Sequence, residues 1–159
     1  MLEAGKKDGI NFSYGGNTGN TFNSHRLLAL AKSKSYEMQN KVIEEIFKCY
    51  FEQEGDITLD EVLIECGKKG GLQEDEIKQM LESDQFAAEV KKEVNDAQWG
   101  TKPGEIPIHG VPFIKLNGNQ VATGAMSVED AVEKMLIWPY WQWFGIIGMG
   151  QDMKNLVKI

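Results

Sequence analysis

The chain has 159 residues, 42% hydrophobic and 26% charged, which is the composition of a folded globular protein and a length that favours one domain. Its formal net charge of −7 argues against a nucleic-acid partner, because such binding depends on clustered Lys and Arg. No apolar run reaches the roughly 18 residues of a membrane span, and the opening MLEAGKKDG has no apolar signal-peptide core, so we expect no membrane span and a cytoplasmic protein.

The first hundred residues predict a loop followed by a block of helices. Residues 1–20 are rich in Gly, Asn and Ser and predict a loop, with 10–12 as a candidate strand fragment. Apolar residues then recur at helical spacing through residues 21–100. The expected helices cover about 21–34, 36–53, 59–69, 74–82 and 84–99. Thr58 and Glu61 form a capping-box signature for the third, and the fifth should begin at Ser83 or Asp84.

The pattern changes in residues 101–137, where prolines interrupt any helix. Two β-prone runs, 111–116 and 119–122, flank Asn117 and Gly118, a strong hairpin signal. Ser127 with Asp130 then caps a last amphipathic helix. The aromatic-rich tail, 138–159, either packs over the hairpin or the last helix or contacts a partner or membrane surface.

The two cysteines, Cys49 and Cys66, form no CxxC pair, and no Cys or His stands at metal-ligand spacing, so we expect no metal site. Both fall on apolar helix stripes, where a reduced cysteine packs as a small hydrophobe. A disulfide between them is the alternative and needs Cα atoms within about 7 Å.

Two groups of segments carry a family resemblance. The first is NTFNSHRLL at residues 20–28, followed by FKCYF at 47–51 and GDI at 55–57; the second is HGVPF at 109–113, followed by TGA at 123–125. In order and spacing, residues 9–136 resemble the DSBA-like branch of the thioredoxin superfamily. In particular, they resemble the subgroup that includes the polyketide-biosynthesis oxidoreductases and, more distantly, the 2-hydroxychromene-2-carboxylate isomerases. The resemblance implies a helix-dominated α/β protein: a partial thioredoxin fold, with a helical insertion followed by a β-hairpin and a C-terminal helix.

The active-site part of the family has no counterpart here. The family's redox cysteines lie at the start of its first helix, where the positive helix end lowers the thiol pKa. Only 19 residues precede Asn20, fewer than the ~30 of a β-α-β unit. We therefore expect an N-terminally truncated chain with no catalytic residue, in which 1–20 is a loop or a remnant of the missing unit.

The resemblance places the substrate-binding candidates in the loop before the hairpin. It implies a cis peptide bond before Pro112, which leaves the backbone of Val111 free to pair with a substrate strand. Gly110 would keep that approach open. His109 lies beside the loop and could transfer a proton or contact glutathione, although an exposed loop histidine is the simpler interpretation. His25, between leucines of the first helix, is interpreted as a hydrogen-bonded packing residue.

Three functional hypotheses follow. The first is a DSBA-like thiol-disulfide oxidoreductase family protein that is inactive alone and needs no cofactor, whose full-length relatives act on a thiol or disulfide protein or small molecule. The second is a glutathione-dependent isomerase or transferase, in which glutathione supplies the sulfur. The third is a non-catalytic helical interaction module, which binds a partner or self-associates through the exposed strand edge or the aromatic tail.

Overall fold

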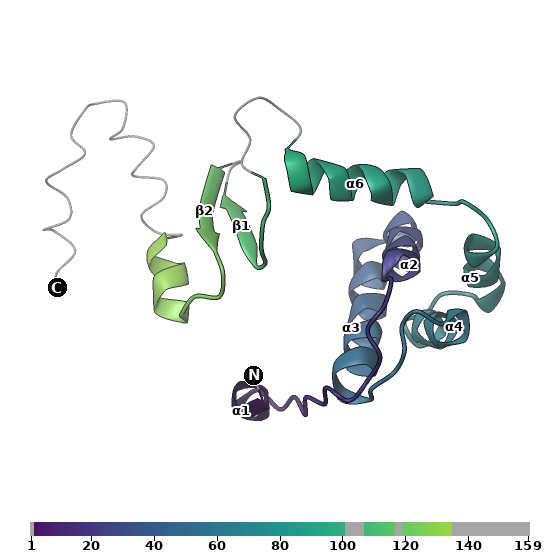
Figure 1. Ribbon diagram of the computed structural model, residues 1–159, viewed down its shortest axis with the longest axis horizontal. Coiled ribbons are helices and arrows are strands. Elements are labelled where there is room, and N and C mark those ends of the chain that lie inside the picture. Colours follow the sequence, from purple (N-terminus) through teal and green to yellow (C-terminus); the bar gives the residue numbers. More distant parts are fainter. Residues whose placement is uncertain (1, 101–106, 117–118, 135–159) are drawn as a thin grey trace, which may run out of the picture. The chain divides into compact units, whose positions relative to one another are not determined.

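A computed structural model of the chain describes residues 2–100, 107–116 and 119–134. The chain divides into two compact units, Met1–Asn95 and Asp96–Ile159. Most described residues are helical, and the described strands form one small sheet (Figure 1). The helix-dominated α/β class expected from the sequence is therefore confirmed. Within the described ranges, no helix is long and apolar enough to cross a membrane.

The core of the first unit lies between α2 (Phe22–Lys34), α3 (Tyr36–Glu52), α4 (Asp60–Lys69) and α5 (Glu74–Leu81). Each of these helices contributes apolar side chains to the buried core. The buried cluster comprises Leu27, Leu30, Ala31, Val42, Ile46, Ile57, Leu63, Cys66, Leu72, Ile77 and Met80. Full burial of one such aliphatic side chain contributes roughly 1.5–3 kcal/mol, so these side chains determine the packing of the four helices.

Arg26 joins α2 to the segment between α5 and α6 (Ala87–Trp99) and is only 5% exposed. Its Nε donates to the Gln85 carbonyl at 2.9 Å, and its Nη2 donates to the carbonyls of Met80 and Ser83. Nη1 donates to Asn23 Oδ1 at 3.0 Å. The guanidinium thus donates to one carbonyl in the last turn of α5, that of Met80, and to two that follow the helix, near its negative end, where the helix dipole favours a cation.

This arrangement delays the start of α6. The expected start at Ser83 or Asp84 is wrong, because α6 begins at Ala87. Phe86 takes a left-handed backbone conformation with φ 62°, which no regular helix contains. The carbonyls of Ser83 and Gln85 meanwhile face Arg26 instead of extending a helix.

The capping box expected for α4 is also wrong. The helix begins at Asp60, and its N-cap residue, Leu59, makes no side-chain capping bond. The Thr58 hydroxyl instead donates to Asp56 Oδ1 at 2.5 Å, and the same oxygen accepts the Thr58 N–H at 3.0 Å. These bonds hold the pKa of Asp56 below its usual value and form a compact turn before the helix.

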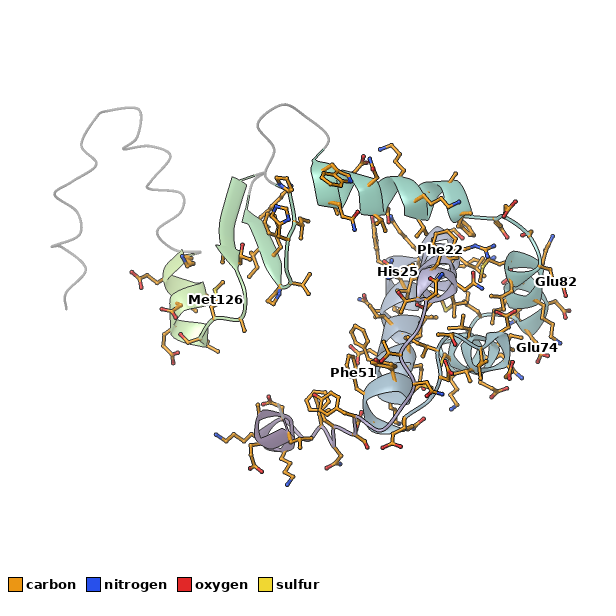
Figure 2. The ribbon with its side chains drawn as sticks, in the orientation of Figure 1. Phe22, His25, Phe51, Glu74, Glu82 and Met126 are labelled. Atoms are coloured by element: carbon orange, nitrogen blue, oxygen red, sulfur yellow. The ribbon has the colours of Figure 1, made fainter. Side chains whose placement is uncertain are left out.

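The N-terminal segment differs from the expected loop because Leu2–Lys7 form a short helix, α1, and residues 10–12 form no strand. The following residues run along the end of α3: the Ser13 N–H donates to the Phe51 carbonyl at 2.7 Å, and the Phe12 and Phe51 rings lie 6.0 Å apart (Figure 2). A Cβ on Gly16 would lie 3.0 Å from the Glu54 backbone. A glycine-rich segment is therefore needed for this close approach.

The second unit contains an antiparallel hairpin of β1 (Phe113–Leu116) and β2 (Asn119–Thr123). The expected hairpin is confirmed, although β1 starts after Pro112 and the turn at 117–118 lies outside the described residues. The register passes from Ile114 opposite Ala122 to Lys115 opposite Gln120, a bulge that increases local twist. A helix covers residues 128–134, with Ser127 Oγ accepting the Asp130 N–H at 3.0 Å as expected. The tail at 138–159 lies outside the described residues.

Replacing Arg26 should test how far the helical unit depends on it. We expect Arg26→Ala to lower the free energy of unfolding by about 3 kcal/mol, because the hydrogen bonds that join α2 to the segment after α5 would be lost together with the packing of the buried side chain. Arg26→Lys should recover only part of this, since an ammonium cannot reproduce the planar fork. Urea unfolding followed by far-UV circular dichroism measures both. Exposed His25→Ala is the matched control, expected within about 0.5 kcal/mol of the wild type; an equally small effect of Arg26→Ala would contradict the assignment.

Candidate functional site

The loop that leads into β1 is fastened to the end of β2. The Gly124 N–H donates to the Pro112 carbonyl at 2.8 Å, immediately beyond the Phe113–Thr123 pair of the ladder. Gly124 has φ 85°, a conformation that other residues rarely adopt. The Val111-Pro112 peptide bond is cis. Pro112 is thus held against the sheet by its own carbonyl, while the residues before it leave the sheet.

Val111 projects from this loop and is 85% exposed. Within the part of the chain that the structure describes, no hydrogen bond engages its backbone N–H or carbonyl. A Cβ built on the preceding Gly110 would meet no atom within 4 Å. The peptide groups before Pro112 can therefore be approached by an extended polypeptide without displacing the protein's own described atoms.

His109 is exposed on the same loop. The neighbouring Ile108 is anchored, because its N–H donates to the Ala97 carbonyl at 2.8 Å. Among the described residues, no hydrogen bond or ion pair joins the imidazole to an acid or a base, so the described geometry gives it no catalytic partner. The four predicted site residues, 109–112, lie together because they are consecutive in the chain. The hydrogen bond from Gly124 to Pro112 adds a residue from the end of β2 to this group.

The loop borders a small apolar and cationic surface on β1. Phe113 and Ile114 are partly buried, and Lys115 Nζ lies 5.7 Å from the centre of the Phe113 ring. Such a contact holds the ammonium over the ring face. The Phe113 ring and the Lys115 ammonium therefore lie on the strand that directly follows Val111 and Pro112.

Sequence reasoning misassigned one residue of α2. His25 is exposed, so its interpretation as a packing residue is wrong (Figure 2). The buried polar residues of α2 are its neighbours Ser24 and Arg26. The signal was present in the spacing: Arg26 stands four residues after Phe22 and four before Leu30, on the stripe that faces the core. The sequence identifies Gly124 only as part of the TGA segment at 123–125. Nothing in that segment predicts its hydrogen bond to Pro112.

Both cysteines carry free thiols in the helical unit. Cys66 is 3% exposed and its Sγ donates to the Glu45 carbonyl at 3.8 Å, whereas Cys49 is partly buried. Burial, followed by the influence of Cys49, raises the pKa of the Cys66 thiol to about 12. A thiol that stays protonated at neutral pH is not the activated thiolate of a redox centre.

Comparison with known proteins returned two results. A family model described as the DSBA-like thioredoxin domain matches residues 1–135. Among solved structures, the chain is similar to the crystal structure of a probable DsbA oxidoreductase from Streptomyces coelicolor, with a TM-score of 0.70 and 25% sequence identity. The match covers 88% of this chain and 57% of that one, so the chain spans less than two thirds of that protein. No curated protein matches the chain. The two matches support the thioredoxin-type fold expected from the sequence.

The Cys66 pKa predicts how stability changes in alkali. Between the ordinary value of 9.0 and about 12, the unfolded chain releases the thiol proton while the native state keeps it. Rising pH should therefore favour unfolding over this window. We expect Cys66→Ala to lose less stability than the wild type as the pH rises across this window. Cys49→Ala should lose nearly as much as the wild type, because burial is the largest cause of the raised Cys66 pKa. Urea unfolding at a series of pH values measures the slopes, and equal slopes in wild type and Cys66→Ala would refute this.

Proposed function

Because the chain belongs to the DSBA-like thioredoxin domain family, we propose that it carries the substrate-binding loop of a thiol-disulfide oxidoreductase and performs no dithiol catalysis by itself. The observation that carries this proposal is the Val111 peptide: its side chain is 85% exposed and its backbone groups have no partner among the described residues, next to a strand. The substrate class we propose is an extended polypeptide that contains a cysteine.

The geometry supports recognition through the backbone. Pairing with the Val111 peptide would place an extended substrate against the protein by main-chain hydrogen bonds, as in strand addition to a sheet edge. Main-chain pairing tolerates many sequences, which suits a protein that meets different cysteine-containing chains. Gly110 leaves the approach open, and the bond from Gly124 holds Pro112 in place during binding.

The cysteine content supports the proposal that the chain performs no dithiol catalysis by itself. Cys49 and Cys66 are the chain's two cysteines, and they do not form a Cys-x-x-Cys pair. The buried Cys66 has its pKa raised to about 12, opposite to the shift that activates a redox thiol. Dithiol exchange at the Val111 loop would therefore need a Cys-x-x-Cys pair, which these 159 residues do not contain.

A side chain at position 110 should block the substrate and spare the fold. We expect Gly110→Val to weaken binding at least tenfold, about 1.4 kcal/mol, because a Cβ there meets only open space and the added methyl groups occupy the approach to Val111. The measurement is fluorescence anisotropy of a labelled extended peptide that contains one alkylated cysteine. Exposed Glu129→Ala is the matched control and should bind as the wild type does. Equal affinity of Gly110→Val and wild type would reject this loop as the binding site.

The absence of dithiol catalysis is tested separately. We expect turnover of a model disulfide peptide with excess reductant to be equal in the wild type and in Gly110→Val, because the Val111 loop contains no Cys-x-x-Cys pair. Turnover that is lost in Gly110→Val would overturn this part of the proposal. Calorimetric binding of glutathione, lost in Gly110→Val, would instead favour the glutathione-dependent isomerase or transferase hypothesis.

A further inference from the structure

The thiols of Cys49 and Cys66 meet at one turn of α3. Cys66 Sγ, on α4, donates to the carbonyl of Glu45 at 3.8 Å. Glu45 lies one helical turn before Cys49, so its carbonyl is also the one that the Cys49 N–H reaches within the helix. Because side chains on a helix lean toward its N-terminus, the Cys49 side chain leans over this same turn. The two sulfur atoms therefore share one small region between the packed helices α3 and α4.

Their electrostatic influence on each other agrees with this placement. After burial, the causes that raise the pKa of Cys66 are the charge of Cys49 and a hydrogen bond with the Cys49 side chain. Both cysteines also belong to or pack against the same core cluster. The Val111 loop belongs to the other unit of the chain.

The chain leaving α3 turns back onto Cys49. The Gly55 N–H donates to the Cys49 carbonyl at 2.9 Å, and a Cβ on Gly55 would lie 2.2 Å from Cys49 Sγ. A side chain at position 55 would therefore collide with the sulfur, and glycine leaves room beside it. Cys49 is partly exposed whereas Cys66 is 3% exposed, so a reagent in solution reaches Cys49 first.

We propose that Cys49 and Cys66 form a reversible disulfide by exchange with a low-molecular-weight disulfide, of which glutathione disulfide is the example. In the first step the Cys49 thiolate attacks one glutathione sulfur, forms a mixed disulfide and releases one glutathione thiolate, which takes up a proton. In the second step Cys66 loses its proton to solvent and attacks the Cys49 sulfur, and the second glutathione leaves. The two protein thiols are oxidised by two electrons, and one glutathione disulfide is reduced to two glutathione molecules.

The bond would close a loop that contains Gly55, Asp56 and the turn before α4. A cross-link there restricts the unfolded chain and joins α3 to α4 covalently. The proposed state is thus a second, oxidised form of the helical unit. It is independent of the function proposed for the Val111 loop, because it uses neither that loop nor a Cys-x-x-Cys pair.

The test is incubation of the reduced chain with glutathione disulfide, followed by intact-mass measurement and peptide mapping. The wild type should lose two hydrogen masses and yield a peptide that links Cys49 to Cys66. Cys66→Ala should stop at a glutathione adduct on Cys49, and Cys49→Ala should stay unmodified. Formation of the link should accelerate with pH, because the pKa of Cys66 is raised to about 12. Circular dichroism of each variant establishes that it is folded.

Three results would overturn the proposal: a wild type that keeps both thiols, a wild type that stops at the same glutathione adduct as Cys66→Ala, and a disulfide between two chains in place of the internal one. Each differs from failure of the proposed function, because the Gly110→Val peptide-binding assay reports only on the Val111 loop.

Discussion

The helical unit depends on one buried cation. The Arg26 guanidinium donates to the carbonyls of Met80, Ser83 and Gln85, and a carboxylate partner is absent from these bonds. Backbone oxygens near the negative end of α5 supply the counter-charge. This accounts for the position of the α5 to α6 junction, for the late start of α6 and for the left-handed residue before it. An apolar residue at position 26 could fill the space, but it would remove the Arg26 donors from the carbonyls of Ser83 and Gln85, while the Met80 carbonyl would keep the Ser83 N–H and hydroxyl as donors.

The second unit has a different constraint. Within the described residues the sheet has two strands, and two strands alone make a marginal sheet. The hydrogen bond from the Gly124 N–H to the Pro112 carbonyl is the last one that the structure describes between the two sides of the hairpin. The Val111 peptide, which precedes Pro112, has no backbone partner among the described residues. In the proposed function, the hydrogen bond from Gly124 positions Pro112 and the Val111 peptide pairs with an extended substrate. Dithiol exchange with a substrate held at this loop is then a separate requirement, because these 159 residues contain no Cys-x-x-Cys pair.

The sequence predicted the helices more reliably than their ends. The bounds of α2, α3 and α5 followed from apolar periodicity, because burying one stripe decides where a helix forms. The starts of α4 and α6 depended on bonds that periodicity does not register: the hydrogen bonds of Asp56 with Thr58, and those of Arg26 across more than fifty residues. The loop at 109–112 was identified through family order, since nothing in its local composition distinguishes a binding peptide from an ordinary turn. The short helix α1 was missed because Leu2–Lys7 carry too few apolar residues for a pattern.

The central claim is that the Val111 peptide groups are available to an extended polypeptide, and amide hydrogen exchange tests it most directly. In the free chain the Val111 amide should exchange rapidly while the Gly124 amide, bonded to Pro112, exchanges slowly. Addition of a saturating cysteine-alkylated peptide should slow exchange at Val111 and leave Gly124 unchanged. A Val111 amide that is already protected in the free chain, or one that the bound peptide leaves unprotected, would contradict the account.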